Sequence, residues 1–396
     1  MKSNTKIFLL FFLFTICISS YAIVITPSSQ FSILTNTPGN ELYTIFGHTA
    51  IRFQDSSQNI DIVFNYGTFD FSTPNFYIEF VKGRLDYFLS VETYTQYLWS
   101  IKPIQSSYEQ ILNLNNDQKD KLLNFLLDNV KPENRNYKYE FFDDNCATRI
   151  RDALKIPLGN DVNFDFFQPD ENQTYRQLLS PYLKINAWID LGINLLLGVY
   201  ADKKVEPLQY FYLPDYVMEA IAVSTINHNN EDHSLVSDTK IIHEAEKKNS
   251  ETNKWFTPFL VFCILLLIII IYTSIGIVKN KKNFIIDRLL FGITALLGLF
   301  LFIISIYTDH LPMKQNFDVL WAFPLHLFVI FILKKNTFRN FLKYYFLVYI
   351  AMLSFTVITW ILFKPSFYFG IIPLLIALFI RSLRLYFYYN KNNANS

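Results

Sequence analysis

Residues 143–152 read DDNCATRIRD, an acidic turn that leads into a helical pattern, and they carry Cys146. From residue 23 to Ile226 the chain has one cysteine and one histidine, Cys146 and His48. A free thiol has a pKa of about 8.5 and needs a neighbouring base to become a strong nucleophile near neutral pH. The sequence therefore predicts that these two side chains meet in the fold as a cysteine nucleophile and its base.

Cys146 is predicted to lie in the first turn of a helix that runs to Leu154. There a thiol faces unpaired backbone N–H groups and the positive end of the helix dipole, which favour the thiolate and can also stabilise an oxyanion. The neighbours Asp144, Asn145 and Arg149 are polar, whereas a cysteine that only packs prefers apolar surroundings. We interpret these three residues as supporting or substrate-contacting residues.

His48 begins a β-rich run, and a second β-rich run covers residues 60–66. The turn-forming residues 55–59 separate the two runs, so a hairpin is predicted. In that hairpin Asn65 falls opposite or next to His48, and it is our candidate for the third residue that fixes the imidazole tautomer. A register shift of one or two residues would bring Asp61 there instead, so Asp61 remains the alternative.

Composition divides the chain into unlike parts. The net charge of the 396 residues is +1, and no basic tract indicates nucleic-acid binding. The hydrophobic content of 51% averages a water-soluble pattern over residues 23–254 and a strongly apolar one over residues 255–390. Residues 1–22 have a basic start, an apolar run and small residues at the end, which is the pattern of a cleavable signal peptide.

The cysteines and histidines outside the predicted pair indicate no metal site. An exported domain with one cysteine forms no intrachain disulfide, so Cys146 is either a packed side chain or a functional thiol. Cys263 lies in an apolar run and is interpreted as a packing residue. His228, His233 and His243 lie at irregular intervals and are interpreted as surface histidines. We expect no metal and no cofactor.

Four segments are expected along the chain: a signal peptide over 1–22, an exported domain over 23–226, a linker over 227–254, and an all-α transmembrane domain of five helices over 255–390. The linker is inferred from its charged, Asn-rich composition. The apolar run 188–198 could line an acyl-chain groove, lean on a bilayer or form an ordinary core helix.

The transmembrane domain is predicted from hydrophobic runs near the length of about 20 residues that crosses a bilayer. Loops rich in Lys and Arg follow the first, third and fifth runs, which predicts that these loops are cytoplasmic and the N-terminal domain is outside. His310 and Asn316 lie in an outer loop and are candidates for contact with a lipid headgroup or substrate. The five runs are Pro258–Val278, Ile285–Tyr307, Val319–Leu333, Tyr344–Phe363 and Phe367–Leu383.

A histidine strand that precedes a cysteine helix, in the segments Gly47-His48-Thr49-Ala50 and 144–149, resembles the circularly permuted papain-like superfamily. That superfamily includes lecithin:retinol acyltransferase and relatives of the NlpC hydrolases. The resemblance implies an exported domain of the α+β permuted papain-like class, with cysteine as nucleophile, histidine as base and a polar third residue.

Taken with the signal peptide and the membrane domain, segments 47–53, 64–71, 144–152 and 310–326 look like the Bacteroides-type lipoprotein N-acyltransferase (Lnb) family. The resemblance implies that a fatty acyl chain moves from a phospholipid, through a thioester on Cys146, to the α-amine of a diacylglyceryl-cysteine lipoprotein. It also implies a multi-pass protein of the bacterial inner membrane with its site on the periplasmic side.

Two alternatives come from other functional classes. The same Cys146–His48 pair could serve a membrane-anchored hydrolase, either a peptidoglycan amidopeptidase or a phospholipase, with water as the acceptor. The exported domain could also be a binding or sensor module in which Cys146 has no chemical role.

Overall fold

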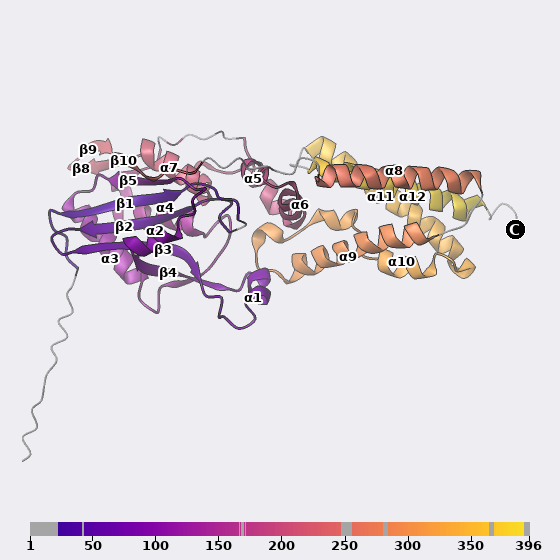
Figure 1. The fold of residues 1–396 in the computed structure, drawn as a ribbon, viewed down its shortest axis with the longest axis horizontal. Coiled ribbons are helices and arrows are strands. Elements are labelled where there is room, and N and C mark those ends of the chain that lie inside the picture. The colour runs from indigo at the N-terminus through magenta and orange to yellow at the C-terminus, as the bar shows by residue number, and fades with distance from the viewer. Residues whose placement is uncertain are drawn as a thin grey trace, which may run out of the picture.

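The computed structural model describes residues 23–41, 43–165, 167, 170, 172–246, 256–279, 284–363 and 368–391. The signal peptide expected over 1–22 lies outside these residues, as do residues 247–254 of the expected linker. Figure 1 shows an α+β domain at one end of the molecule and long helices at the other.

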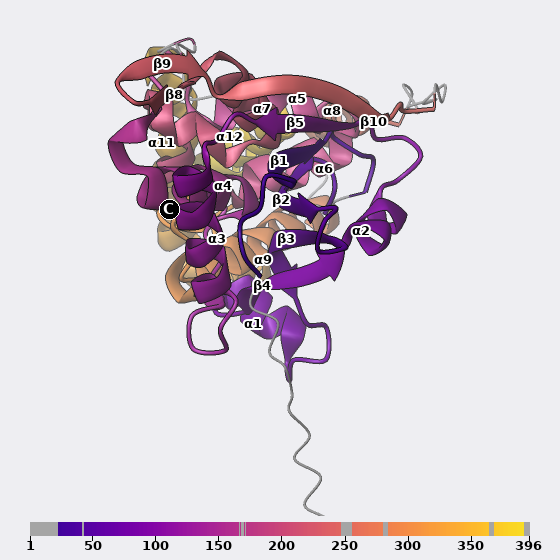
Figure 2. The same ribbon diagram turned by 90° about the vertical axis from the view of Figure 1, so that its left-hand side faces the viewer.

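A seven-stranded antiparallel sheet lies at the centre of the N-terminal domain (Figure 2). Its strand order is β10-β5-β1-β2-β3-β4-β6, so the hairpin β2–β3 lies in the middle. The strands are β1 (Ser29–Asn36), β2 (His48–Asp55), β3 (Ile60–Phe69), β4 (Asp86–Thr93), β5 (Ser107–Leu112), β6 (Asn136–Lys138) and β10 (Val236–His243).

Alternation along the central strands gives the sheet two apolar faces. Ile33 and Ile51 are buried in the main core, on the face where α3, α4 and α7 pack. Leu34 and Ala50 are buried on the other face against Tyr97 of α2. The helices are α2 (Tyr94–Ser100), α3 (Asn116–Asn129), α4 (Cys146–Leu158) and α7 (Pro214–Val223).

Asp55 fixes the turn of the β2–β3 hairpin. Its carboxylate accepts hydrogen bonds from Ser29 Oγ at 2.5 Å and from the amide and hydroxyl of Ser57 at 2.9 and 2.6 Å. Burial raises the pKa of Asp55, but these hydrogen bonds outweigh burial and hold the pKa well below its ordinary value. The register set by this turn is what brings Asn65 next to His48.

The expected linker is wrong over residues 227–243, which form strands. Asn229 and Asn230 have φ of 54° and 70°. Positive φ at both central residues is what a two-residue hairpin turn of type I′ requires, and asparagine tolerates it. Asn229 and Asn230, part of the Asn-rich composition that suggested a linker, therefore form the turn between β8 and β9. A second, three-stranded sheet contains β7 (Val162–Asn163), β8 (Thr225–His228) and β9 (Glu231–Ser234), while β10 extends the main sheet.

The apolar run 188–198 packs against the membrane helices as α6 (Ala187–Leu196). Leu191 of α6 is buried in the core of the helical bundle, and Trp188 Nε1 donates to Phe256 O at 2.9 Å. The remaining short elements of this domain are α1 (Phe76–Lys82), α5 (Tyr175–Leu183), η1 (Gly159–Asp161), η2 (Val199–Asp202) and η3 (Pro207–Tyr212).

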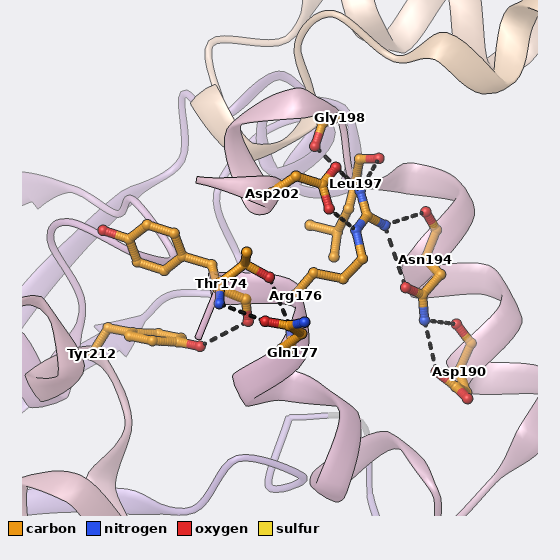
Figure 3. Close-up of polar contacts among 10 residues, drawn as sticks. Thr174, Arg176, Gln177, Asp190, Asn194, Leu197, Gly198, Asp202 and Tyr212 are labelled. Atoms are coloured by element: carbon orange, nitrogen blue, oxygen red, sulfur yellow. Dashed lines mark hydrogen bonds and ion pairs between the residues drawn. The ribbon is translucent and has the colours of Figure 1, made fainter. Parts of the chain in front are cut away.

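Arg176 on α5 connects the C-terminal end of α6 to η2 by hydrogen bonds and an ion pair (Figure 3). Its guanidinium donates to Asp202 at 2.8 Å, to Asn194 O at 3.0 Å and to Leu197 O at 3.1 Å. Carbonyls at a helix C-terminus lack intrahelical donors, so a buried arginine satisfies several of them together. The adjacent Gly198 amide then donates to Pro312 O at 2.7 Å, which joins this region to the membrane part.

Four helices among the described residues are long and apolar enough to cross a membrane. They are α8 (Pro258–Val278), α9 (Ile285–Tyr307), α11 (Arg339–Phe363) and α12 (Ile372–Lys391). Short 3₁₀ helices flank them at η4 (Leu311–Met313), η6 (Asn336–Phe338) and η7 (Phe369–Ile371).

The third expected span, Val319–Leu333, is wrong as a continuous helix. It is divided into η5 (Phe317–Leu320) and α10 (His326–Ile332), with Pro324 at the break. Backbone freed by a break inside apolar surroundings needs new partners. Tyr349 OH donates to Trp321 O at 2.6 Å, and Gly298 of α9 leaves room for this backbone, since a Cβ there would lie 1.4 Å from Ala322 O.

The segment from 317 to 333 still runs from one end of the bundle to the other. At the end next to the N-terminal domain, Asn316 Nδ2 donates to Leu195 O at 2.6 Å. At the far end, Tyr389 OH donates to Leu333 O at 2.6 Å, and Arg339 donates to Tyr389 O at 3.0 Å. The Lys- and Arg-rich loop that contains Arg339 therefore lies at the end away from the N-terminal domain, as the expected orientation requires.

Replacing Asp55 tests the hairpin turn. We expect Asp55→Ala to destabilise the N-terminal domain by about 2–4 kcal/mol, because the buried Ser29 hydroxyl and several part-buried donors lose their acceptor. Thermal unfolding of the full-length protein in detergent, followed by circular dichroism, measures the effect as a lower midpoint. The control is Asp70→Ala, which removes an exposed carboxylate that binds Ser72 in another turn. Equal midpoints for the two variants would contradict this account.

Candidate active site

Cys146 is the first residue of α4, and Asn145 is the residue that caps this helix. The Asn145 Oδ1 atom accepts from the amides of Ala147 at 2.8 Å and Thr148 at 2.9 Å. Its Nδ2 donates to Tyr212 O at 2.7 Å. Because every polar atom of this buried side chain is engaged, Asn145 holds the start of α4 in place and sets the position of the thiol.

His48 is the first residue of β2 and is half-buried. The β2–β3 ladder ends at Ile51 and Phe64, so His48 lies just beyond the paired region. There His48 Nε2 is 2.7 Å from Asn65 Oδ1 on β3. The structure thus brings Asn65 to the imidazole, as the predicted hairpin implies.

Glu92 on β4 fixes the orientation of this Asn65 amide. Asn65 Nδ2 donates to Glu92 Oε1 at 2.8 Å. A carboxylate only accepts, so the amide must turn its oxygen toward the ring, and His48 Nε2 must carry the proton. His48 Nδ1 is therefore the ring nitrogen whose lone pair is available to the thiol.

His48 and Cys146 are neighbours, and each shifts the pKa of the other through its charge and through hydrogen bonding. Burial raises the pKa of Cys146, but the charge and hydrogen bond of His48 outweigh burial, so the pKa of Cys146 falls below its ordinary value. Burial lowers the pKa of His48, and the Cys146 thiolate together with Asn65 raises it above the ordinary value. These opposite shifts favour a thiolate–imidazolium pair.

Hydrogen bonding from the backbone of Thr49 and Ala147 also lowers the pKa of Cys146. Thr49 lies in the part of β2 that β3 does not pair with, which leaves its N–H free to point at the thiol. Two backbone donors beside a nucleophile stabilise negative charge there. Helix-start amides were expected from the sequence, but a donor from β2 was not.

A bulge in β3 makes room for the Cys146 side chain. Between Asn65 and Thr68 the register with β4 shifts by one residue. Gly67 lies in this bulge with φ of 89°, and a Cβ there would lie 3.2 Å from Cys146 Cβ. The conformation and the close approach together require glycine at this position.

Asp144 and Arg149 form an ion pair beside the thiol. Arg149 Nη2 donates to Asp144 Oδ2 at 2.6 Å, and the guanidinium stacks over the Tyr137 ring with its carbon 4.1 Å from the centroid. Burial raises the pKa of Asp144, and Arg149 opposes that shift. The pair connects the turn before Cys146 to α4, so these two residues help to position Cys146.

Asp61, the alternative third residue, lies away from the imidazole. It accepts from Arg52 Nε at 2.8 Å and from Arg52 Nη2 at 2.7 Å. Arg52 is also paired with Glu109 at 2.9 Å. Asp61 is therefore part of an ion-pair network further along β2.

His310 and Asn316 lie at the junction between the two parts of the molecule. His310 Nε2 contacts Phe80 O at 3.0 Å, and its Nδ1 is 3.9 Å from Glu140 Oε2. Asn316 is buried; its Nδ2 donates to Leu195 O, and its Oδ1 accepts from the Asp318 amide at 2.9 Å. Both polar atoms of the Asn316 side chain thus have partners within the protein, and His310 approaches Glu140, which lies in the turn before Cys146.

The fold and this site define a membrane-anchored α+β domain with a Cys–His–Asn cluster at the start of a helix. The family models match both parts of the chain: the Lnb N-terminal periplasmic domain matches residues 21–181, and the Lnb transmembrane domain matches residues 249–393. The chain belongs to the Lnb family, and it is a multi-pass membrane protein with a periplasmic N-terminal domain. The searches of curated proteins and of solved structures gave no match.

Glu92 is the site residue that the sequence analysis missed. It lies on β4 two residues beyond Ser90, which pairs with Asn65, so the antiparallel register of β3 and β4 brings it to the Asn65 amide. A partner that depends on the register between two strands gives no signal in the local sequence.

Neutralising Glu92 tests its effect on the thiol. In Glu92→Gln the His48 imidazolium loses a nearby negative charge, so its pKa falls. The imidazole beside the thiol is then protonated less often, so the pH at which Cys146 becomes reactive rises. The rate of iodoacetamide alkylation against pH, measured by mass spectrometry of the Cys146 peptide, reports this shift. Glu133→Gln, at an exposed turn, is the control and leaves the profile unchanged; a wild-type profile in Glu92→Gln would contradict the assignment.

Proposed function

We propose that this chain is a lipoprotein N-acyltransferase that takes a fatty acyl chain from a membrane phospholipid and gives it to the α-amine of a diacylglyceryl-cysteine lipoprotein. The observation that carries the proposal is the Cys146–His48–Asn65 cluster, on a domain fastened directly to membrane helices. Membership of the Lnb family supports the assignment of the acceptor.

In the first half-reaction the Cys146 thiolate attacks the ester carbonyl carbon of the phospholipid. The C–O ester bond breaks as the C–S bond forms, and the His48 imidazolium gives its proton to the departing lysophospholipid oxygen. Asn65 keeps the ring in the required orientation, and the amides beside the sulfur, including that of Thr49, stabilise the oxyanion.

In the second half-reaction the lipoprotein amine attacks the thioester. The C–N bond forms, the C–S bond breaks, and His48 takes the proton that the amine loses. The thiolate–imidazolium pair is thereby restored. The two substrates react in turn at one site, which gives ping-pong kinetics.

The same proposal includes the finer architecture. The histidine strand β2 precedes the cysteine helix α4, which supports a permuted papain-like arrangement. The segment 317–333 serves as the third of five crossings, and the protein lies in the inner membrane with basic loops in the cytoplasm. Both lipid substrates then reach the site by lateral diffusion, and no metal takes part in the steps above.

Replacing the nucleophile tests the reaction. Wild-type protein exposed to phospholipid should gain the mass of one acyl chain on the Cys146 peptide, as a hydroxylamine-sensitive thioester. Cys146→Ser should lose this adduct and lower N-acylation of a diacylglyceryl lipopeptide by at least about 10³-fold. Cys263→Ser, in α8, is the matched control and keeps both activities.

The products separate transfer from hydrolysis. An N-acylated lipopeptide is the expected product. Release of free fatty acid, with no acylated peptide when the lipopeptide is in excess, would assign the site to a hydrolase. Full N-acylation by Cys146→Ser would remove the thiol from the mechanism.

A further inference from the structure

Helix α1 and the loop before it carry large apolar side chains that the protein leaves uncovered. None of the residues of α1 is buried, and Tyr77 is 77% exposed. Soluble surfaces rarely keep such groups together unless they contact a partner or a membrane. We call this set the α1 surface; it consists of Phe71, Tyr77, Ile78, Phe80 and Val81.

The α1 surface is held at the end of a membrane helix. Thr308, which follows the last residue of α9, donates from Oγ1 to Val81 O at 3.0 Å. The Asp309 amide donates to Lys82 O at 2.7 Å, and Arg84 pairs with the Asp309 carboxylate at 2.6 Å. Figure 1 shows α1 at the junction of the two parts, beside α9. These bonds fix the depth of α1 relative to the bundle.

The occupant of this surface follows from its position and charge. The last turns of α9 expose Ile303, Ile306 and Tyr307, so the uncovered apolar surface continues from α9 onto α1. The charges on α1, Glu79 and Lys82, pair with each other at 3.4 Å and leave no net attraction for an ionic partner. An aromatic, uncharged element at the end of a membrane helix matches the bilayer interface.

Aromatic rings lead from the α1 surface to the thiol. The ring of Phe76 on α1 is 5.7 Å from that of Phe69, which is 5.3 Å from that of Tyr87. Tyr87 stacks on Tyr139 at 4.4 Å. The ring of Tyr87 is also 6.5 Å from that of Tyr137, and a Cβ at Gly67 would lie 4.0 Å from Tyr137 Oη and 3.2 Å from Cys146 Cβ, so these rings lead to the thiol.

His310 links the same surface to the catalytic turn. Its ring contacts Phe80 O of α1 on one side and approaches Glu140 on the other. Glu140 exchanges backbone hydrogen bonds with Asp144, two residues before Cys146. A displacement of α1 by lipid would therefore also displace the turn that holds Cys146.

We propose that the α1 surface inserts into the interface of the periplasmic leaflet and that phospholipid acyl chains reach Cys146 from this side, along the rings of Phe76, Phe69 and Tyr87. The identity of the lipid as acyl donor rests on the proposed function. The insertion of α1 rests only on the exposed side chains and on the attachment to α9.

Insertion is measured without any enzyme activity. Ile78→Cys, in full-length protein that carries Cys146→Ser and Cys263→Ala, is labelled with the environment-sensitive fluorophore NBD and placed in phosphatidylethanolamine–phosphatidylglycerol nanodiscs. We expect a blue-shifted emission that lipids with a nitroxide near the headgroup quench. Trp99→Cys, at an 80% exposed position on α2, is the matched control, and its label should show the emission wavelength of NBD in water. Water-like emission from position 78 would overturn the proposal.

The approach of the donor is measured in the protein with its native cysteines. The double variant Tyr77→Gln/Ile78→Gln should form the Cys146 acyl adduct from vesicle phospholipid about tenfold more slowly. Its rate of iodoacetamide alkylation at Cys146 should stay at the wild-type value, which shows an intact site, and Trp99→Gln should match wild type in both assays. Unchanged adduct formation in the double variant would overturn the route. An absence of any adduct in wild-type protein would instead overturn the proposed function, while the fluorescence still decides insertion.

Discussion

The contact of the start of α4 with the edge of the β2–β3 ladder is the constraint on which the site depends. Asn145 pins the first turn of the helix to the backbone around it, and the bulge at Gly67 lets that turn come within van der Waals distance of β3. His48 lies three residues beyond Ile51, the last residue of β2 that pairs with β3, and there it is a neighbour of Cys146. A side chain at position 67 would place its Cβ 3.2 Å from Cys146 Cβ, so the glycine in the bulge leaves the space that the thiol occupies.

The electrostatics of the site are built outward from this contact. A thiol in a partly buried position resists ionisation, and the structure offsets that resistance with an imidazolium and two backbone amides. The imidazolium is in turn supported by Asn65 and, through it, by Glu92. The strands β2, β3 and β4 and the helix α4 each contribute one of these charged or polar side chains. A rigid sheet is needed to keep these side chains at the distances that the interactions require.

The membrane part is attached on both sides of the domain, by α1 to α9 and by the end of α6 to the loop that contains Pro312. Hydrogen bonds to backbone carbonyls dominate these attachments, and such bonds fix distance and direction more strictly than apolar packing. The broken segment 317–333 is tolerated because neighbouring helices satisfy its freed carbonyl and Gly298 gives it space. These attachments therefore fix the position of the site relative to the membrane helices.

The sequence by itself determined the two-part organisation, the apolar helices, the hairpin and the residues Cys146, His48 and Asn65, because periodicity, turn residues and rare reactive side chains are local signals. Tertiary structure alone decided that Glu92 supports Asn65, that Asp61 belongs to another network and that residues 227–243 form strands. It also decided that the third apolar run is broken and that α1 lies at the end of α9. Each of these depends on a bulge, a pairing register or a contact between distant segments, and such relations leave no trace in the local order of residues.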